Sequence, residues 1–173
     1  MPQLAGKTVP PVLLKRWRSA ASRAGEAIVL ITVDDRGRIH TALLAPVLVV
    51  PIDPGSFLLT VAHGSRTARH LRSGRPASLH VADSEGVWTL QGVASVARPA
   101  LRSVPPLGAF RFEIRRVLSD HPPPAEKGAR IVSGIRFVAP APLRAIWRAV
   151  RRELVVLAEE DPAVPKKVRR TIR

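Results

Sequence analysis

The chain of 173 residues contains no cysteine and no tyrosine. Without cysteine it has no disulfide framework, no thiolate nucleophile and no cysteine-based zinc site. Aromatic residues are also scarce, with four Phe and three Trp, so the sequence offers few side chains on which nucleic-acid bases would stack. Stability must therefore come from packing, alone or together with oligomerisation.

Segments typical of secretion and of membranes are missing as well. The N-terminal stretch has no apolar run that ends in a small-residue cleavage site, so we expect no signal peptide. The longest apolar run, 42–52, is interrupted by Pro46 and Pro51 and falls short of the about 20 residues that span a bilayer. These observations predict a cytoplasmic protein with no membrane partner.

Acidic residues are also scarce relative to basic ones. The chain has 13 Asp+Glu and 28 Lys+Arg, which give it a net charge of +15 at pH 7. Such an excess attracts nucleic acid, anionic lipid or phosphorylated small molecules. It is also typical of GC-rich genomes, because nearly all the cations are arginine. The basic tail 164–173 keeps non-specific nucleic-acid binding among the hypotheses, although the sequence contains no known nucleic-acid-binding motif.

The composition that remains is that of a globular domain. Hydrophobic residues make up 46% of the chain, and the length suits one domain, since domains commonly have about 100–150 residues. We expect an N-terminal helix within 1–25, a β-barrel over 26–140, and an amphipathic helix with a basic tail over 141–173.

Apolar residues at helical spacing predict a helix near each end of the chain. Residues 12–24 form the first, and Gly25 follows as a residue that can stop it. Residues 143–158 form the second, with arginines over much of the surface that its apolar face leaves. That apolar face consists of Leu143, Ile146, Trp147, Val150, Leu154 and Leu157.

Between these helices, short β-branched runs alternate with turn residues and predict strands. Two hairpins come first, and their consecutive order favours antiparallel pairing in a barrel or sandwich. The seventh strand contains Gly134, which is typical of a bulge. In order, the predicted strands are 27–33, 39–50, 56–62, 77–82, 87–96, a strand around 110–115, and 131–138.

A short helix over 65–73 lies between the third and fourth predicted strands. Ser65 is suited to cap it, and Gly74 and Pro76 end it. Backbone amides at a helix start, a hydroxyl and a guanidinium are the groups that bind phosphate well. Ser65, Arg66 and the first helical amides supply all three.

The segment 55–81, GSFLLTVAHGSRTARHLRSGRPASLHV, carries a resemblance, as does the hairpin 28–40, IVLITVDDRGRIH. Together they resemble the signature of the pyridoxamine-phosphate-oxidase-like, FMN-binding split-barrel proteins. The resemblance covers 27–96 in detail and the ends in outline. It implies a mainly β fold with flanking helices, an antiparallel split β-barrel of the flavin-reductase kind. It also implies a homodimer that holds FMN between its subunits and oxidises or reduces a small molecule.

The same resemblance implies which residues bind the cofactor. Ser65 and Arg66 match the pair that holds the flavin phosphate. The next position is often a second cation in the family, but here it is Thr67, and Arg69 or Arg38 would have to compensate. Positions that match residues beside the ring are His40, Thr41 and Ala42 on the second strand and Leu59, Thr60 and Val61 on the third.

Other functions stay open at this stage. Split barrels also include deazaflavin-dependent reductases and haem-degrading proteins, and the arginine-rich last helix would suit the anionic tail of a deazaflavin. Thr67 keeps a cofactor-free structural dimer open as well. The five histidines lack metal-ligand spacing, so we expect no metal site. The sequence identifies no catalytic residue.

Overall fold

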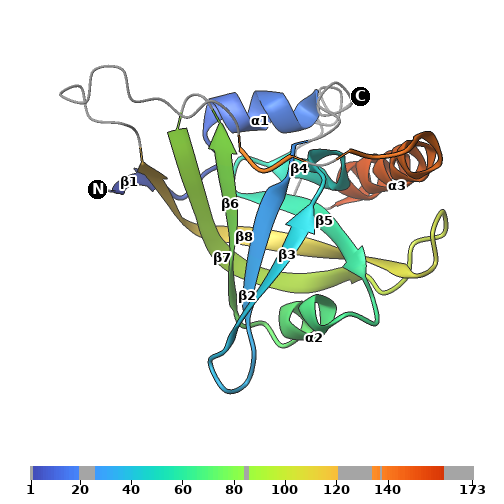
Figure 1. The fold of residues 1–173 in the computed structure, drawn as a ribbon, viewed down its shortest axis with the longest axis horizontal. Coiled ribbons are helices and arrows are strands. Elements are labelled where there is room, and N and C mark those ends of the chain that lie inside the picture. The colour runs from blue at the N-terminus through green and yellow to red at the C-terminus, as the bar shows by residue number, and fades with distance from the viewer. Residues whose placement is uncertain (1, 20–25, 84–85, 121–133, 137, 162–173) are drawn as a thin grey trace.

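The computed structural model of the chain describes residues 2–19, 26–83, 86–120, 134–136 and 138–161. Its centre is an eight-stranded antiparallel sheet that curls into an open barrel, with helices around it (Figure 1). The helices are α1 (Pro11–Arg18), α2 (Arg66–Arg72) and α3 (Ala141–Glu160), with a 3₁₀ turn η2 (Pro46–Leu48). The strands are β1 (Gln3–Gly6), β2 (Ile28–Val33), β3 (Ile39–Leu44), β4 (Val49–Asp53), β5 (Ser56–Ala62), β6 (Pro76–Asp83), β7 (Gly86–Arg98) and β8 (Leu107–Asp120).

The strand order leaves a seam in the barrel. Neighbouring strands follow the order β3-β2-β6-β7-β8-β5-β4, and β1 pairs with β8. The hairpins β2–β3 and β4–β5 follow one another in the chain but lie at opposite edges of the sheet. The 3₁₀ turn η2 joins β3 to β4, so these two edges are connected by the chain and not by a hydrogen-bonded ladder in the described residues.

The main core fills the inside of the barrel, and α1 and α2 close its two ends (Figure 1). Trp17 of α1 is fully buried, with its ring centroid 5.3 Å from that of Phe57. Phe57 in turn stacks on Phe112 of β8 at 4.9 Å. At the other end, Ala68 and Leu71 of α2 are fully buried. Burial of such side chains stabilises a fold by about 1.5–3 kcal/mol each.

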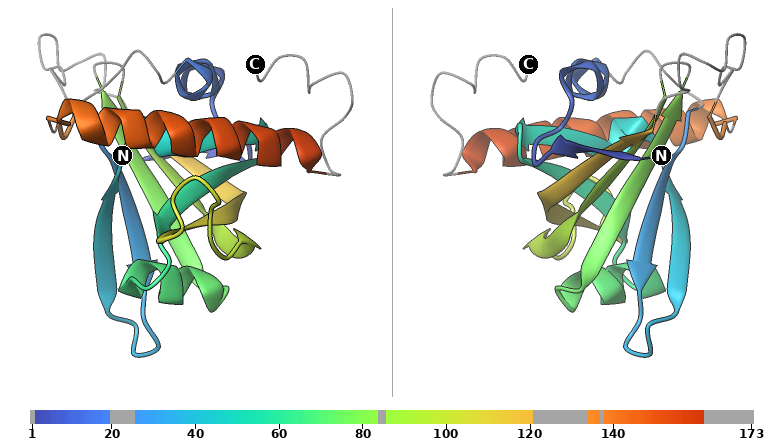
Figure 2. Two further views of the ribbon diagram at one scale, coloured as in Figure 1. Left: turned by 90° about the vertical axis from the view of Figure 1, so that its right-hand side faces the viewer. Right: turned by 90° about the vertical axis from the view of Figure 1, so that its left-hand side faces the viewer.

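A second apolar cluster lies outside the barrel, where α3 covers the outer face of β4 and β5. Figure 2 shows this long helix crossing the barrel. Its buried residues repeat at four-residue spacing, which keeps them on one face of the helix. From α3 these are Val150, Leu154 and Ala158, and from the strands Val50, Ile52 and Leu58.

The opposite outer face is uncovered by any described element. On the hairpin β2–β3 this face carries Val29, Ile31 and Val33, which are half-buried, and their partners on β3. Ile39 and Leu43 are 70% and 55% exposed. Apolar strand residues in adjacent positions make a flat surface that a second protein surface would bury favourably.

Curvature of the sheet depends on Gly92 of β7. The register of β7 and β8 shifts between Gln91 and Gly92, as at a β-bulge. A Cβ at position 92 would lie 2.0 Å from the carbonyl oxygen of Glu113, so the strands approach too closely for any other residue. Bulges of this kind increase the local twist and help a sheet close.

Most predicted elements are confirmed, including the mainly β class, the antiparallel barrel and the short helix α2. The single strand expected over 39–50 is wrong. It ends at Leu44, and Pro46 starts the 3₁₀ turn before β4 begins. Proline causes the break because it lacks the N–H that a strand ladder uses. Strand β1 was not expected from the sequence.

Two further expectations are corrected in part. Helix α1 ends at Arg18, and the hydroxyl of the capping residue Ser19 donates to the carbonyls of Lys15 and Arg16. Positions 20–25 lie outside the described residues. The strand over 131–138 does not form in 134–136 or at 138, where Arg136 makes only an isolated bridge. Gly134 instead approaches β6, because a Cβ there would lie 2.3 Å from the Ala82 oxygen.

None of the described helices combines the length and apolar character required to traverse a bilayer.

Candidate functional site

The turn that starts α2 has the expected capping geometry. Ser65 has extended backbone angles, and its Oγ accepts a hydrogen bond of 3.1 Å from the amide of Ala68. The amides of Arg66 and Thr67 belong to the first helical turn, which has no preceding carbonyls for them inside the helix. Gly74, at a φ of +66°, ends the segment in the left-handed region that favours glycine.

Four arginines of this segment divide into two pairs. Arg72 donates to the carbonyl of His63, and Arg75 donates to the carbonyl of Asp34 at 2.9 Å. Arg66 and Arg69 are exposed, and their side chains form no hydrogen bond or ion pair with any described residue. One guanidinium group at the start of α2 and one a turn further along it are therefore available to an anion.

The expected ring contacts on β5 lie on both faces of that strand. Leu59 and Val61 point into the barrel and belong to the main core. Thr60 points the other way, is 1% exposed, and its Oγ1 has no hydrogen-bond partner among the described residues. Beyond Leu59, which pairs with Val49, β5 continues without β4 and pairs only with β8. Its last backbone edge therefore faces the seam.

On β3, His40 and Thr41 point to opposite faces as well. Thr41 is exposed on the outer face. His40 faces α2, where its ring centroid lies 4.9 Å from that of His70. His70 Nδ1 is also 3.0 Å from the Oγ1 of Thr32, which is buried. The sequence alone does not single out His70 or Thr32, because their contact depends on how α2 docks against the β2–β3 hairpin.

Charges around this histidine pair favour a neutral His70. Burial lowers the pKa of His70, and the neighbouring charge of His40 lowers it further. On the adjacent turn, hydrogen bonds from the amide and side chain of Arg38 and from the amide of Arg36 lower the pKa of Asp34 to about 2. At neutral pH the site therefore contains an uncharged imidazole beside a tightly held carboxylate.

The residues predicted to bind a cofactor meet at α2. This helix packs against β2, β3 and β5, so the capped turn, the histidine pair and the open edge of β5 surround one end of the seam. Leu59, Val61 and Thr41 are the exceptions: the side chains of Leu59 and Val61 are enclosed in the core, and Thr41 lies on the outer face of β3. No group of three or more metal-ligating side chains exists among the described residues.

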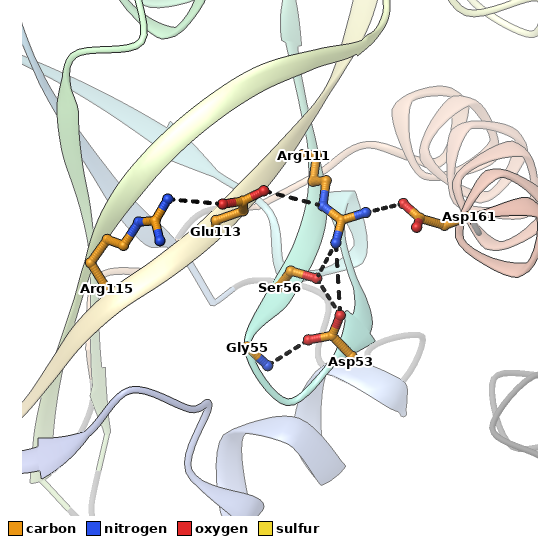
Figure 3. Close-up of polar contacts among 7 residues, drawn as sticks. All are labelled: Asp53, Gly55, Ser56, Arg111, Glu113, Arg115 and Asp161. Atoms are coloured by element: carbon orange, nitrogen blue, oxygen red, sulfur yellow. Dashed lines mark hydrogen bonds and ion pairs between the residues drawn. The ribbon is translucent and has the colours of Figure 1, made fainter. Parts of the chain in front are cut away.

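A second polar cluster surrounds Arg111 of β8 (Figure 3). Its guanidinium pairs with Asp161 just beyond α3 and lies 3.9 Å from Asp53 and 3.8 Å from Glu113. It also donates to the Oγ of Ser56 at 3.4 Å. Because carboxylates surround this cation on several sides, the cluster fixes the end of α3 to the barrel rather than offering a free binding group.

Comparisons with known proteins agree with this architecture. No family model matches the sequence, and no curated protein matches it. Among solved structures, a candidate pyridoxamine 5'-phosphate oxidase from Lactobacillus delbrueckii has a TM-score of 0.54 and 15% identity, over 68% of this chain and 98% of that one. HupZ from group A Streptococcus has a TM-score of 0.49 and 11% identity, over 68% and 97%.

HutZ, the haem storage protein of Vibrio cholerae, has a TM-score of 0.43 and 16% identity, over 73% of this chain and 96% of that one. The likeness to the Lactobacillus protein confirms the expected fold, a split barrel of the kind found in pyridoxamine 5'-phosphate oxidase-like proteins. At 15% identity it shows the fold alone.

Proposed function

We propose that this protein binds FMN and acts as a flavin-dependent oxidoreductase on a small molecule. The observation that carries the proposal is the capped helix α2, on which Arg66 at the start and Arg69 one turn later are exposed and have no acidic partner among the described residues. Two guanidinium groups, first-turn amides and the Ser65 hydroxyl fit a phosphomonoester in charge and in hydrogen-bonding capacity. Arg69 supplies the second positive charge, which the neutral side chain of Thr67 does not provide.

The isoalloxazine ring would lie at the seam beside α2. The end of β5 supports this placement, because the backbone of residues 60–62 is not paired with β4 and its edge is open. Backbone groups at such an edge suit the polar rim of a flavin ring, while His40 offers a side chain from the opposite strand. The side chains of Leu59 and Val61 support the floor of the seam from inside the core.

Homodimer formation is part of the same proposal. The uncovered sheet face with Ile39 and Leu43 is apolar and extended over neighbouring strands, and a second copy would bury it. A cofactor at the seam would then be shielded by the partner subunit. The flavin supplies hydride and electron transfer when bound, and the protein positions and electrostatically tunes it.

A visible absorption spectrum of the purified protein, with identification of any small molecule released on denaturation, is the direct test. Binding constants for FMN and for riboflavin, which lacks the phosphate, should then be compared in wild type and Arg66→Ala. We expect Arg66→Ala to weaken FMN binding by about 1–3 kcal/mol, the range for a hydrogen bond to a charged group. Riboflavin binding should hardly change.

Arg115→Ala is the matched control, because Arg115 is an exposed arginine on β8 that pairs with Glu113. If Arg66→Ala lost affinity for FMN and for riboflavin equally, Arg66 would not be a phosphate-binding residue. Failure of the wild-type protein to bind FMN would overturn the proposal. A deazaflavin or haem spectrum in that case would keep the fold and replace the chemistry.

A further inference from the structure

A cleft of about 460 Å³ lies between α3 and the loop that joins β7 to β8. The left view of Figure 2 shows this loop directly beside the helix. Clefts of about 300–1,000 Å³ are the usual size of small-molecule sites. None of the cofactor-binding residues expected from the sequence lines it.

Glu153 of α3 holds the loop in place. Its Oε1 accepts from the amide of Arg102 at 2.8 Å, and its Oε2 accepts from the amide of Ser103 at 2.8 Å and from the Ser103 hydroxyl at 2.7 Å. Leu101 anchors the same loop, being 1% exposed in the cluster beneath α3. The wall of the cleft is therefore fixed at several points, as a preformed site requires.

Three arginines line the same cleft as this carboxylate. Arg98 has a nitrogen 3.7 Å from Glu153, whereas Arg102 and Arg152 are exposed and their side chains form no ion pair within the described part of the chain. Burial raises the pKa of Glu153, but hydrogen bonds from Ser103 and Arg102 and the charge of Arg98 lower it overall. The carboxylate is committed to the loop, so the cleft keeps an excess of positive charge.

The floor of the cleft is apolar. Ala149, Val156 and Leu157 line it from α3, and Val156 is 50% exposed. Glu160, the remaining acidic residue of the lining, is eight residues after Arg152, which places it about 12 Å along the helix axis. Val156 lies one helical turn from both Arg152 and Glu160, so the apolar floor lies between the basic and the acidic end of the cleft.

We propose that this cleft binds a small organic anion, an apolar group that carries a phosphate or carboxylate. The anionic group is held by Arg102 and Arg152 with Arg98 behind them, since guanidinium forks match both oxyanions. The apolar group lies on Val156 and Leu157 and is removed from water there. This cleft shares no lining residue with the proposed flavin site.

Isothermal titration calorimetry on the full chain with 1-naphthyl phosphate tests the site, because that probe combines an aromatic body with a phosphate. We expect binding that is weaker by about tenfold or more for 1-naphthol, which lacks the charge, and for inorganic phosphate, which lacks the rings. The double variant Arg102→Ala, Arg152→Ala should lose about tenfold or more for 1-naphthyl phosphate and nothing for 1-naphthol.

Two controls separate this site from the others. Arg148→Ala removes an exposed arginine from the same helix outside the cleft lining and should bind the probe as wild type does. Arg66→Ala, which tests the flavin site, should also leave 1-naphthyl phosphate binding unchanged. The inference is overturned if wild type does not bind the probe, if the double variant binds it equally well, or if Arg66→Ala abolishes binding.

Discussion

Asp34 shows how much a single turn residue does in this fold. Its Oδ1 accepts from the amides of Arg36 and Arg38, both at 2.9 Å, and its Oδ2 pairs with the Arg38 side chain at 2.7 Å. The carboxylate is buried, with 6% exposed. Asx-type bonds of this kind close the β2–β3 hairpin, which carries His40 to α2.

The lowered pKa of Asp34, about 2 against 3.8, predicts how stability depends on pH. A group with a lowered folded-state pKa stabilises the fold above its unfolded pKa, and that contribution is lost as pH falls from about 4 through about 2. Asp34→Asn should therefore be less stable than wild type at about pH 6. The difference between them should narrow in acid.

Urea denaturation midpoints at several pH values would measure this, with Asp35→Asn as the control for the same charge change at an exposed neighbour. If the difference in denaturation midpoint between wild type and Asp34→Asn stayed constant down to pH 2, the lowered pKa of Asp34 would be contradicted. Ionisation of Asp34 would then not be coupled to folding.

Among individual residues, the sequence predicted the interactions that form between neighbours in the chain. The Ser65 cap follows from a hydroxyl residue ahead of Ala68 and Leu71, with Gly74 behind them, and no distant residue is needed. The contact of His40 with His70 could not be predicted, because it requires both the hairpin register and the docking of α2. The side chain of Thr60 points away from the barrel interior, and its contact with a flavin ring stays a prediction.

Helix α3 is the element whose role depends most on one polar side chain. Arg151 donates to the carbonyls of Trp17 at 2.7 Å and Arg18 at 3.1 Å, which are at the end of α1. It also reaches the carbonyls of Val47 and Val49, both at 3.3 Å. Last-turn carbonyls have no hydrogen-bond partner inside their own helix. Arg151 of α3 therefore supplies the donors that the last carbonyls of α1 would otherwise lack.

Arg151→Met should lower the free energy of unfolding by about 2–4 kcal/mol, because buried carbonyls lose a charged donor. Arg148→Met, on an exposed position of the same helix, should change it by less than about 0.5 kcal/mol. Chemical denaturation of both variants measures the difference. Equal, small effects would show that water replaces the guanidinium at no cost.

The amphipathic pattern predicted α3 to within two residues at each end, but it did not predict which part is covered. Ile146 was placed on the apolar face and is 44% exposed, whereas Val150 and Leu154 are fully buried. Arg151 lies outside the predicted apolar face, and its hydrogen bonds to α1 do not follow from the helical pattern. Helical spacing identifies a face, and only the position of the barrel decides how far along that face packing extends.

For the whole molecule, the uncovered sheet face predicts self-association. Light scattering coupled to gel filtration should give about twice the chain mass of 18.8 kDa for wild type. Leu43→Lys should weaken the dimer by about tenfold or more, because it places a charge on a face that would be desolvated. Ile146→Lys, on the far helix, should remain dimeric. If wild type were monomeric, or if only Ile146→Lys dissociated, the uncovered sheet face would not be a dimer interface.

Strand order is the property of the whole molecule that the sequence could not supply. Turn residues revealed the hairpins β2–β3 and β4–β5, since each is closed locally. Nothing in those residues separates the hairpins to opposite edges. That separation arises because β8 pairs with both β7 and β5, and pairing between distant segments leaves no periodic signal.

The seam between β3 and β4 also has a kinetic consequence. The hairpin β2–β3 gains its second neighbour only when β6 exists, and the hairpin β4–β5 gains its second neighbour only when β8 exists. The N-terminal half of the sheet must therefore wait for the C-terminal half. Proteins dominated by such non-local pairings fold in about milliseconds to seconds, slower than helical bundles. During synthesis the first hairpins would emerge with unpaired edges, and the barrel would assemble only after β8 had left the ribosome.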